Sequence, residues 1–231
     1  MANAIIMASG LGTRMQPLTK STPKPLIKVL GKPMIESVID ALEKRGVDSI
    51  FVVVGYLKEQ FDYLCKKYDN VFLIENPDFR TVNNISSIYY ACDKLGKDDV
   101  FICEADLFVA NKDLFCRELT RSCYFGKYVK GYSDDWVFET DNVGYITRVG
   151  KCGKDNYNMV GVSYFKAEDT RILAEKIRLV YGSKGFETLF WDDVVNDNLD
   201  VLKLRVHEVD VNDIYEIDTV EELKIINGEN N

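Results

Sequence analysis

The chain has 231 residues, 46% of them hydrophobic, and a formal net charge of −8 at pH 7. That length supports one α/β domain with a sizeable core. The acidic balance excludes a general nucleic-acid binder, which needs an excess of Lys and Arg, but it allows a small anionic ligand in a locally basic pocket.

The first half of the chain alternates predicted strands and helices. An apolar run predicts a strand at residues 3–7, and Pro33 followed by spaced apolar residues predicts a helix that ends near Gly46. Further strands are predicted at 49–54, 71–74 and 99–103, and helices at 57–67 and 84–95. This alternation predicts a parallel sheet with right-handed crossover connections.

From residue 123 the pattern changes to consecutive strands. They are predicted near 123–131, 136–140, 143–149 and 157–165, with a turn at Asp141–Asn142. Helices near 168–181 and 187–196 and a strand at 201–207 follow, and the last helix begins at a capping box of Thr219 and Glu222. We expect a single domain over 1–227 and a polar tail at 228–231.

The cysteines and the apolar segments limit the class of protein. The six cysteines form no C-x-x-C pair and His207 is the only histidine, so a zinc site is disfavoured. The N-terminus lacks a signal-peptide layout, and no apolar run approaches the roughly 20 residues that span a bilayer. We therefore expect a cytoplasmic protein whose partners include neither nucleic acid nor a membrane.

The loop after the first strand, MASGLGTRMQPLTKSTPKPL at residues 7–26, predicts an anion site. Gly10 and Gly12 allow backbone N–H groups to approach a phosphate, Arg14 offers a forked donor and Lys24 a point charge. The loop does not match a dinucleotide fold, because Met15 stands where that motif has its third glycine. No Gly-Lys-Ser/Thr follows, so the P-loop pattern also fails.

These residues carry a resemblance to a known family. G-x-G-T-R at Gly10–Arg14, followed by S-T-P-K-P-L at Ser21–Leu26, resembles the signature of nucleotidyltransferases that join a nucleoside triphosphate to a phosphorylated small molecule. The resemblance implies an α/β, Rossmann-like nucleotidyltransferase fold with a mixed, mostly parallel central sheet flanked by helices. It also implies a nucleotide-binding half at 1–122 and an acceptor-binding half at 123–227.

The same resemblance implies roles for individual residues. Arg14 and Lys24 are the expected catalytic residues, and Mg²⁺ is the expected cofactor, bound by Asp106 in FICEADLFV and Asp192 in FETLFWDDVVND. The expected nucleotide-binding residues are Ala8, Gly10, Leu11, Gly12, Thr13, Asn84, Ser86, Ser87 and Glu104. A phosphate monoester is already anionic at neutral pH, so this chemistry needs charge cancellation and alignment more than a general base.

A narrower resemblance concerns the acceptor. ENPDFRTVNNISSIYYACD at 75–93, with GYLKEQFDYL, SDDWVFET, FWDDV and NDIYEIDTVEEL, resembles the short bacterial phosphocholine cytidylyltransferases. It implies transfer of CMP from CTP to phosphocholine, which gives CDP-choline and pyrophosphate. A quaternary ammonium needs aromatic faces; Trp136 matches the family's choline-contacting tryptophan, and Trp191 and Tyr215 are candidates for the other walls.

Several alternatives stay open. The acceptor could instead be 2-aminoethylphosphonate, whose primary ammonium would favour carboxylates, and acids stand beside every candidate aromatic. A sugar-1-phosphate nucleotidyltransferase and a catalytically silent nucleotide-sensing module are the weaker hypotheses. The polar tail is compatible with fusion to another domain, and a homo-oligomer is equally compatible with the sequence.

Overall fold

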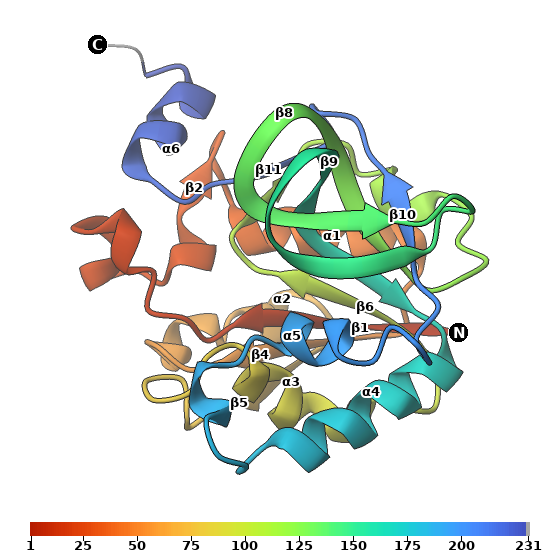
Figure 1. Ribbon diagram of the computed structural model, residues 1–231. Coiled ribbons are helices and arrows are strands. Elements are labelled where there is room, and N and C mark those ends of the chain that lie inside the picture. Colours follow the sequence, from red (N-terminus) through yellow and green to blue (C-terminus); the bar gives the residue numbers. More distant parts are fainter. Residues whose placement is uncertain (230–231) are drawn as a thin grey trace.

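The computed structural model describes residues 1–229 and is built on a seven-stranded sheet with the order β10-β8-β9-β6-β1-β4-β5 (Figure 1). Strands β6, β1, β4 and β5 are parallel, β9 is antiparallel to both β6 and β8, and β10 is parallel to β8. The expected mixed, mostly parallel sheet is confirmed. Its strands are β1 (Ala2–Ala8), β4 (Ser49–Val54), β5 (Val71–Glu75), β6 (Asp99–Glu104), β8 (Cys123–Thr140), β9 (Ile146–Phe165) and β10 (Arg205–Glu208).

Two small sheets and the helices complete the described structure. One sheet pairs β2 (Lys28–Val29) with β3 (Lys32–Pro33), and the other pairs β7 (Leu107–Val109) with β11 (Ile214–Glu216). No helix within residues 1–229 combines the length and the apolar character that crossing a membrane requires. The α-helices are α1 (Met34–Arg45), α2 (Leu64–Lys67), α3 (Ile85–Ala91), α4 (Ala167–Val180), α5 (Trp191–Asn196) and α6 (Val220–Asn227).

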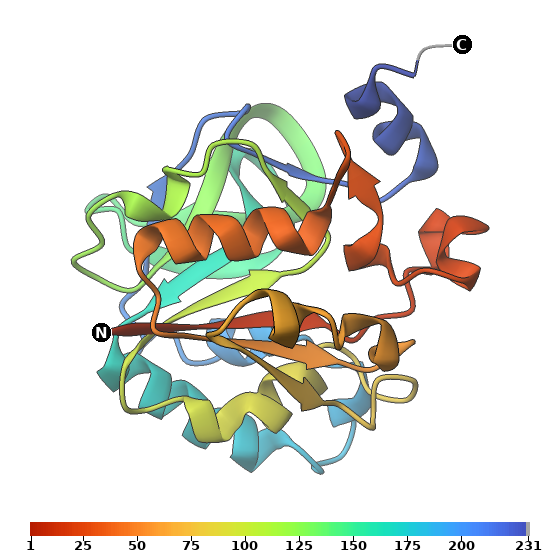
Figure 2. The same cartoon turned by 180° about the vertical axis from the view of Figure 1, so that it is seen from behind.

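The sheet is covered on both faces, and the alternation of side chains along β1 shows why. Ala4, Ile6 and Ala8 are buried in a core with α1 and α2, whereas Ile5 is buried in a second core with α3, α4 and α5. Figure 2 shows α1 on one side of the sheet and α4 on the other. A third, smaller cluster joins α6 to the segment around β2.

The elements predicted in the first half are confirmed, except that two helices are partly 3₁₀; the helix predicted over 84–95 is α3 followed by a 3₁₀ turn at Cys92–Lys94. Helix α1 begins after Pro33 and ends at Gly46, whose φ of 79° suits a helix C-terminus. The helix predicted over 57–67 is a 3₁₀ turn at Lys58–Phe61 followed by the short α2. The sheet edge at the carboxyl ends of β1 and β6 carries the loops that form the site.

The second half differs from the prediction in strand number. The strands expected near 123–131 and 136–140 are one strand, β8, and those near 143–149 and 157–165 are one strand, β9. Their pairing shifts register at several positions, and Gly131 (φ 92°) and Cys152 (φ 64°) adopt left-handed conformations there. Such bulges bend a strand without ending its ladder, which gives the curved β8–β9 pair in Figure 1.

The elements after β8 are mostly of the predicted types. The turn after β8 is confirmed by a hydrogen bond from the Gly144 amide to the Asp141 carbonyl, 3.0 Å long. Thr219 and Glu222 form the predicted capping box at the start of α6. The strand expected at 201–207 is shorter than predicted, since a turn ends at residue 201 and β10 begins only at Arg205. Of the predicted polar tail, residues 230–231 lie outside the described part.

Candidate functional site

The glycine loop folds directly onto the segment that carries Lys24. Gly12 has a φ of 61°, and a Cβ there would meet the Lys24 Cβ at 2.9 Å, so the close approach requires glycine. The Thr19 hydroxyl donates a hydrogen bond of 2.8 Å to the Gly12 carbonyl. The predicted basic residues are therefore held beside the end of β1.

Lys24 lies between two carboxylates. Its Nζ donates to Asp106 Oδ2 at 2.5 Å and to Asp218 Oδ1 at 2.6 Å, and its side chain is only 8% exposed. Arg14 Nη1 reaches the other oxygen of Asp218 at 2.7 Å. Burial lowers the pKa of Lys24, but the two carboxylates outweigh burial and raise its pKa above the usual value. Lys24 is therefore a buried, charged group.

Glu216 joins Asp106 and Asp218 in an acidic cluster. Each of the three can place a carboxylate oxygen within 4.8 Å of the others. The cluster forms because β11 pairs with β7 and the Ile217 amide donates to the Asp106 carbonyl at 3.2 Å. Glu216 is exposed as a residue, but loss of solvent around its carboxylate and the neighbouring charges of Asp106 and Asp218 raise its pKa to about 8. Carboxylate oxygens are the ligands that Mg²⁺ prefers, so the donor set fits that ion.

Asp192, expected as the second metal ligand, is not a member of this cluster. It lies at the start of α5, is 3% exposed, and its Oδ1 accepts a 2.9 Å hydrogen bond from the Tyr124 hydroxyl. Burial raises the pKa of Asp192 to about 7. The structure instead brings Asp218 to Asp106. The sequence marks Asp218 only as the residue before the capping residue Thr219, which does not show that it lies beside Asp106.

The expected nucleotide-binding serines are held by a buried network. Asn76, which is fully buried, places its Nδ2 within hydrogen-bond distance of the hydroxyls of Ser9, Ser86 and Ser87. The Asn84 side chain accepts from the Trp191 amide at 3.0 Å. These side chains fix the loop after β1 against α3. Asn76 was not predicted from the sequence.

The three candidate aromatic residues have separate packing partners. Trp136 is half-buried and meets the Phe190 ring edge-on at 5.3 Å. Trp191 is 3% exposed and stacks on Tyr124 at 5.8 Å, so it belongs to the core. Lys127 lies over the Tyr215 ring, 5.5 Å from its centroid. Within residues 1–229 no ring pair joins any two of the three candidates.

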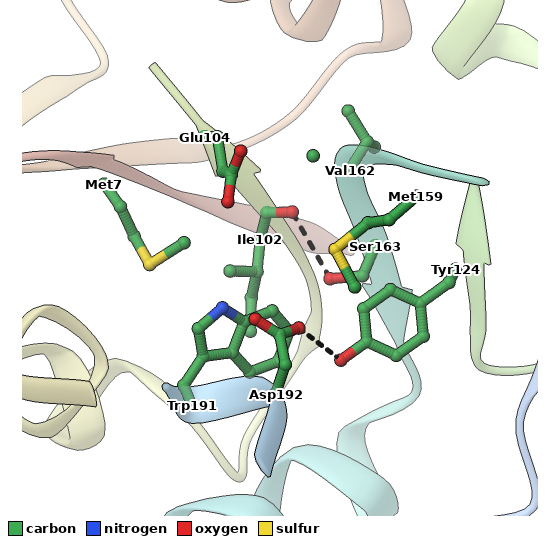
Figure 3. Close-up of a pocket in the computed structure, with 10 residues that line it drawn as sticks. Met7, Ile102, Glu104, Tyr124, Met159, Val162, Ser163, Trp191 and Asp192 are labelled. Atoms are coloured by element: carbon green, nitrogen blue, oxygen red, sulfur yellow. Dashed lines mark hydrogen bonds between the residues drawn. The ribbon is translucent and has the colours of Figure 1, made fainter. Parts of the chain in front are cut away.

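A narrow cavity lies beside the acidic cluster, between the end of β6 and the start of α5 (Figure 3). Glu104 forms one wall, and Gly161 (φ 71°) allows the approach, because a Cβ there would meet Glu104 Oε2 at 2.9 Å. Burial raises the pKa of Glu104 well above its usual value, and the charges of Asp106, Glu216 and Asp192 raise it further. Glu104 therefore lies among other carboxylates.

Comparison with known proteins identifies the family. Residues 4–128 match the family model described as a MobA-like NTP transferase domain. The chain belongs to this family. The fold, with its glycine loop at the end of β1, is the nucleotidyltransferase fold that the sequence predicted.

Relatives match nearly the whole chain. It is 55% identical to the 2-aminoethylphosphonate cytidylyltransferase of Lancefieldella rimae over 96% of this chain and 90% of that protein. It is 37% identical to the choline-phosphate cytidylyltransferase of Streptococcus pneumoniae over 96% of this chain and 95% of that one. The solved structure of CTP:phosphocholine cytidylyltransferase from Streptococcus pneumoniae superimposes with a TM-score of 0.91 at 36% identity, covering 99% of this chain and 98% of that chain.

Proposed function

We propose that this protein is a cytidylyltransferase that transfers CMP from CTP to 2-aminoethylphosphonate and releases pyrophosphate. The observation that carries the proposal is the position of Lys24 between Asp106 and Asp218, beside the Gly10–Gly12 loop. In the reaction, a phosphonate oxygen forms a bond to the α-phosphorus of CTP. The bond from that phosphorus to the β-phosphate oxygen breaks, and pyrophosphate leaves with the electron pair.

The residues of the site have distinct tasks in this transfer. The backbone of the Gly10–Gly12 loop and the Arg14 guanidinium would bind the triphosphate, and Lys24 would place a positive charge beside the reacting phosphorus. Asp106 and Asp218 would hold Mg²⁺, with Asp218 in the role first given to Asp192. The ion would supply positive charge against the negative oxygens of the nucleotide. No residue need act as a general base, because the acceptor oxygen is already anionic.

The acceptor is chosen on two grounds. The relative named for 2-aminoethylphosphonate is 55% identical, whereas the relative named for choline phosphate is 37% identical. The acceptor side also offers carboxylates from Glu104, Glu216 and Asp192, which suit a primary ammonium. Phosphocholine, the acceptor favoured by the sequence, stays the second candidate because Trp136 of β8 is half-buried and meets the Phe190 ring edge-on, which gives two adjacent aromatic side chains.

The test is a panel of acceptors assayed by pyrophosphate release with CTP and Mg²⁺. We compare 2-aminoethylphosphonate, phosphocholine, phosphoethanolamine and glucose 1-phosphate, and then replace CTP by UTP, ATP and GTP. A preference for CTP with 2-aminoethylphosphonate supports the proposal. A higher kcat/KM with phosphocholine would move the protein to the second candidate, and no pyrophosphate with any acceptor would favour the nucleotide-sensing module.

A further inference from the structure

The cavity beside Glu104 has walls from four elements of the fold. Glu104 ends β6, Tyr124 lies on β8, Met159 lies on β9, and Trp191 and Asp192 begin α5 (Figure 3). The acidic cluster is close by, because Asp106 follows Glu104 by two residues on the same segment. A group in this cavity would therefore lie near the reacting centre without touching the glycine loop.

The size of the cavity selects a small group. Its free volume, about 10 Å³ for the centre of a water-sized sphere, leaves room for roughly one water molecule. A primary ammonium group is about as large as one water molecule. A trimethylammonium group carries three further carbon atoms and exceeds that space.

Two of the polar side chains that line the cavity, Trp191 and Glu104, have no hydrogen-bond partner in the described residues. Trp191 Nε1 is buried and has no hydrogen-bond partner in the described part of the chain, and Figure 3 shows the indole nitrogen on the side of the ring that faces Glu104. Within residues 1–229 no donor is recorded for either oxygen of Glu104, and Asp192 receives a side-chain hydrogen bond only at Oδ1, from Tyr124. A half-buried carboxylate without a donor, beside a buried one that retains acceptor capacity, favours a small donor-rich cation.

The distance to the acidic cluster also suits a short acceptor. One residue separates Glu104 from Asp106 at the bend after β6, so their Cα atoms lie at most roughly 7 Å apart. Three single bonds join the phosphorus and nitrogen atoms of an aminoethylphosphonate, and in extended form they span roughly 4 Å. The phosphonate can thus lie toward Asp106 while the ammonium reaches Glu104.

We propose that this cavity binds the primary ammonium group of the acceptor, with Glu104 and Asp192 accepting its hydrogen bonds. Trp191 Nε1–H, which has no partner in the described residues, donates to Glu104 once the ammonium is bound and so holds that carboxylate toward the ligand. The assignment rests on the proposed function and makes it more specific: the same cavity that accepts an ammonium excludes a quaternary amine by its volume.

The experiment compares two acceptors that differ only at the terminal group. We measure kcat/KM with CTP for 2-aminoethylphosphonate and for propylphosphonate, in which a methyl group replaces the ammonium. The wild-type enzyme should favour the amine, and Glu104→Gln should lower that preference about 10- to 100-fold, the usual value of a hydrogen bond to a charged group. The loss should fall on KM for the amine. Equal losses with both acceptors, or an unchanged preference, would overturn the assignment.

Two further variants control this result. Asp193→Asn removes a neighbouring negative charge that does not line the cavity and keeps an oxygen to accept from the Phe190 amide, so it should leave the preference unchanged. A similar fall with Asp193→Asn would attribute the effect to general charge and overturn the proposal. Trp191→Phe keeps the ring and removes Nε1–H, so it should reduce the preference even if Glu104→Gln does not fold.

The outcomes also separate this inference from the proposed function. If the wild-type enzyme uses 2-aminoethylphosphonate and propylphosphonate equally well, the cavity assignment fails and the proposed reaction stands. If it uses phosphocholine in preference to 2-aminoethylphosphonate, the choice of acceptor itself is wrong.

Discussion

The carboxylates at the carboxyl end of the sheet fall into two groups with different surroundings. Asp106 and Asp218 share the Lys24 ammonium, and Asp218 also pairs with Arg14. Glu104 and Asp192, a short distance away, have no ion pair with any Lys or Arg in the described residues. The chain supplies a cation to the first group and none to the second. In the proposed reaction, the missing cation comes from the acceptor.

The largest expected effect comes from changing the first group, Asp106 and Asp218, whose negative charge is balanced by Lys24 and Arg14. Asp106→Asn removes the negative charge of a carboxylate that would bind Mg²⁺ and also removes one ion-pair partner of Lys24. We therefore expect the rate of CMP transfer to fall about 1,000-fold or more. Pyrophosphate release measures the rate, and circular dichroism checks the fold. Asp113→Asn, at an exposed position paired with Lys44, is the control. A rate within tenfold of the wild type would contradict the assignment of Asp106.

Removing Lys24 tests whether its positive charge matters for turnover and for metal binding by Asp106 and Asp218. Lys24→Met should lower turnover about 100-fold, because the positive charge beside the reacting phosphorus is lost. Without nucleotide, the variant should bind Mn²⁺ more tightly than the wild type, since Lys24 no longer competes for Asp106 and Asp218. Calorimetric titration measures this affinity, with the exposed Lys20→Met as control. Weaker Mn²⁺ binding by the variant would refute the competition.

The second group, Glu104 and Asp192, should instead affect how the free energy of unfolding depends on pH. The pKa of Asp192 is raised from its usual 3.8 to about 7, so the folded protein keeps this proton where the unfolded chain has released it. That contribution to the free energy of unfolding is present below pH 4 and is lost as the pH rises through 7, on the order of 3–4 kcal/mol. Asp192→Asn should therefore gain stability relative to the wild type between pH 4.5 and pH 8. Urea unfolding of both proteins at the two pH values measures this gain. An equal difference in stability between variant and wild type at both pH values would contradict the prediction.

A smaller effect should follow from enlarging the cavity of the second group. Met159→Ala removes a side chain that lines the cavity, so methyl groups can enter. We expect the ratio of kcat/KM for phosphocholine to that for 2-aminoethylphosphonate to rise about tenfold, the size of effect that pocket volume usually has. Met34→Ala, in a separate core, controls for general loosening. A ratio that does not rise would show that cavity volume does not set the choice of amine.

The fold was predictable because its signals are local. Alternating strands and helices in the first half predicted the parallel sheet, and Pro33 and Gly46 marked the ends of α1. The second half was harder, since β8 and β9 bend at bulges and a bend in a paired strand resembles a strand end in the sequence.

The site was predictable only in part, for a physical reason. Arg14, Lys24 and Asp106 belong to motifs with short spacing. Asp218 reaches them through the pairing of β11 with β7, a contact between segments about a hundred residues apart, which no local pattern encodes. The sequence also did not show that Trp191 is buried against Tyr124, because a tryptophan that begins a helix has the same sequence pattern whether it is exposed or buried.

The bridge from Lys24 to Asp218 joins residues 194 positions apart. During synthesis, the glycine loop and Asp106 emerge long before Asp218, so Lys24 has only one of its two carboxylate partners until Asp218 has been made. The nascent domain can acquire its sheet early, but it cannot acquire its reaction centre early. A chain that terminates before Asp218 would therefore lack a complete centre however well its sheet had formed.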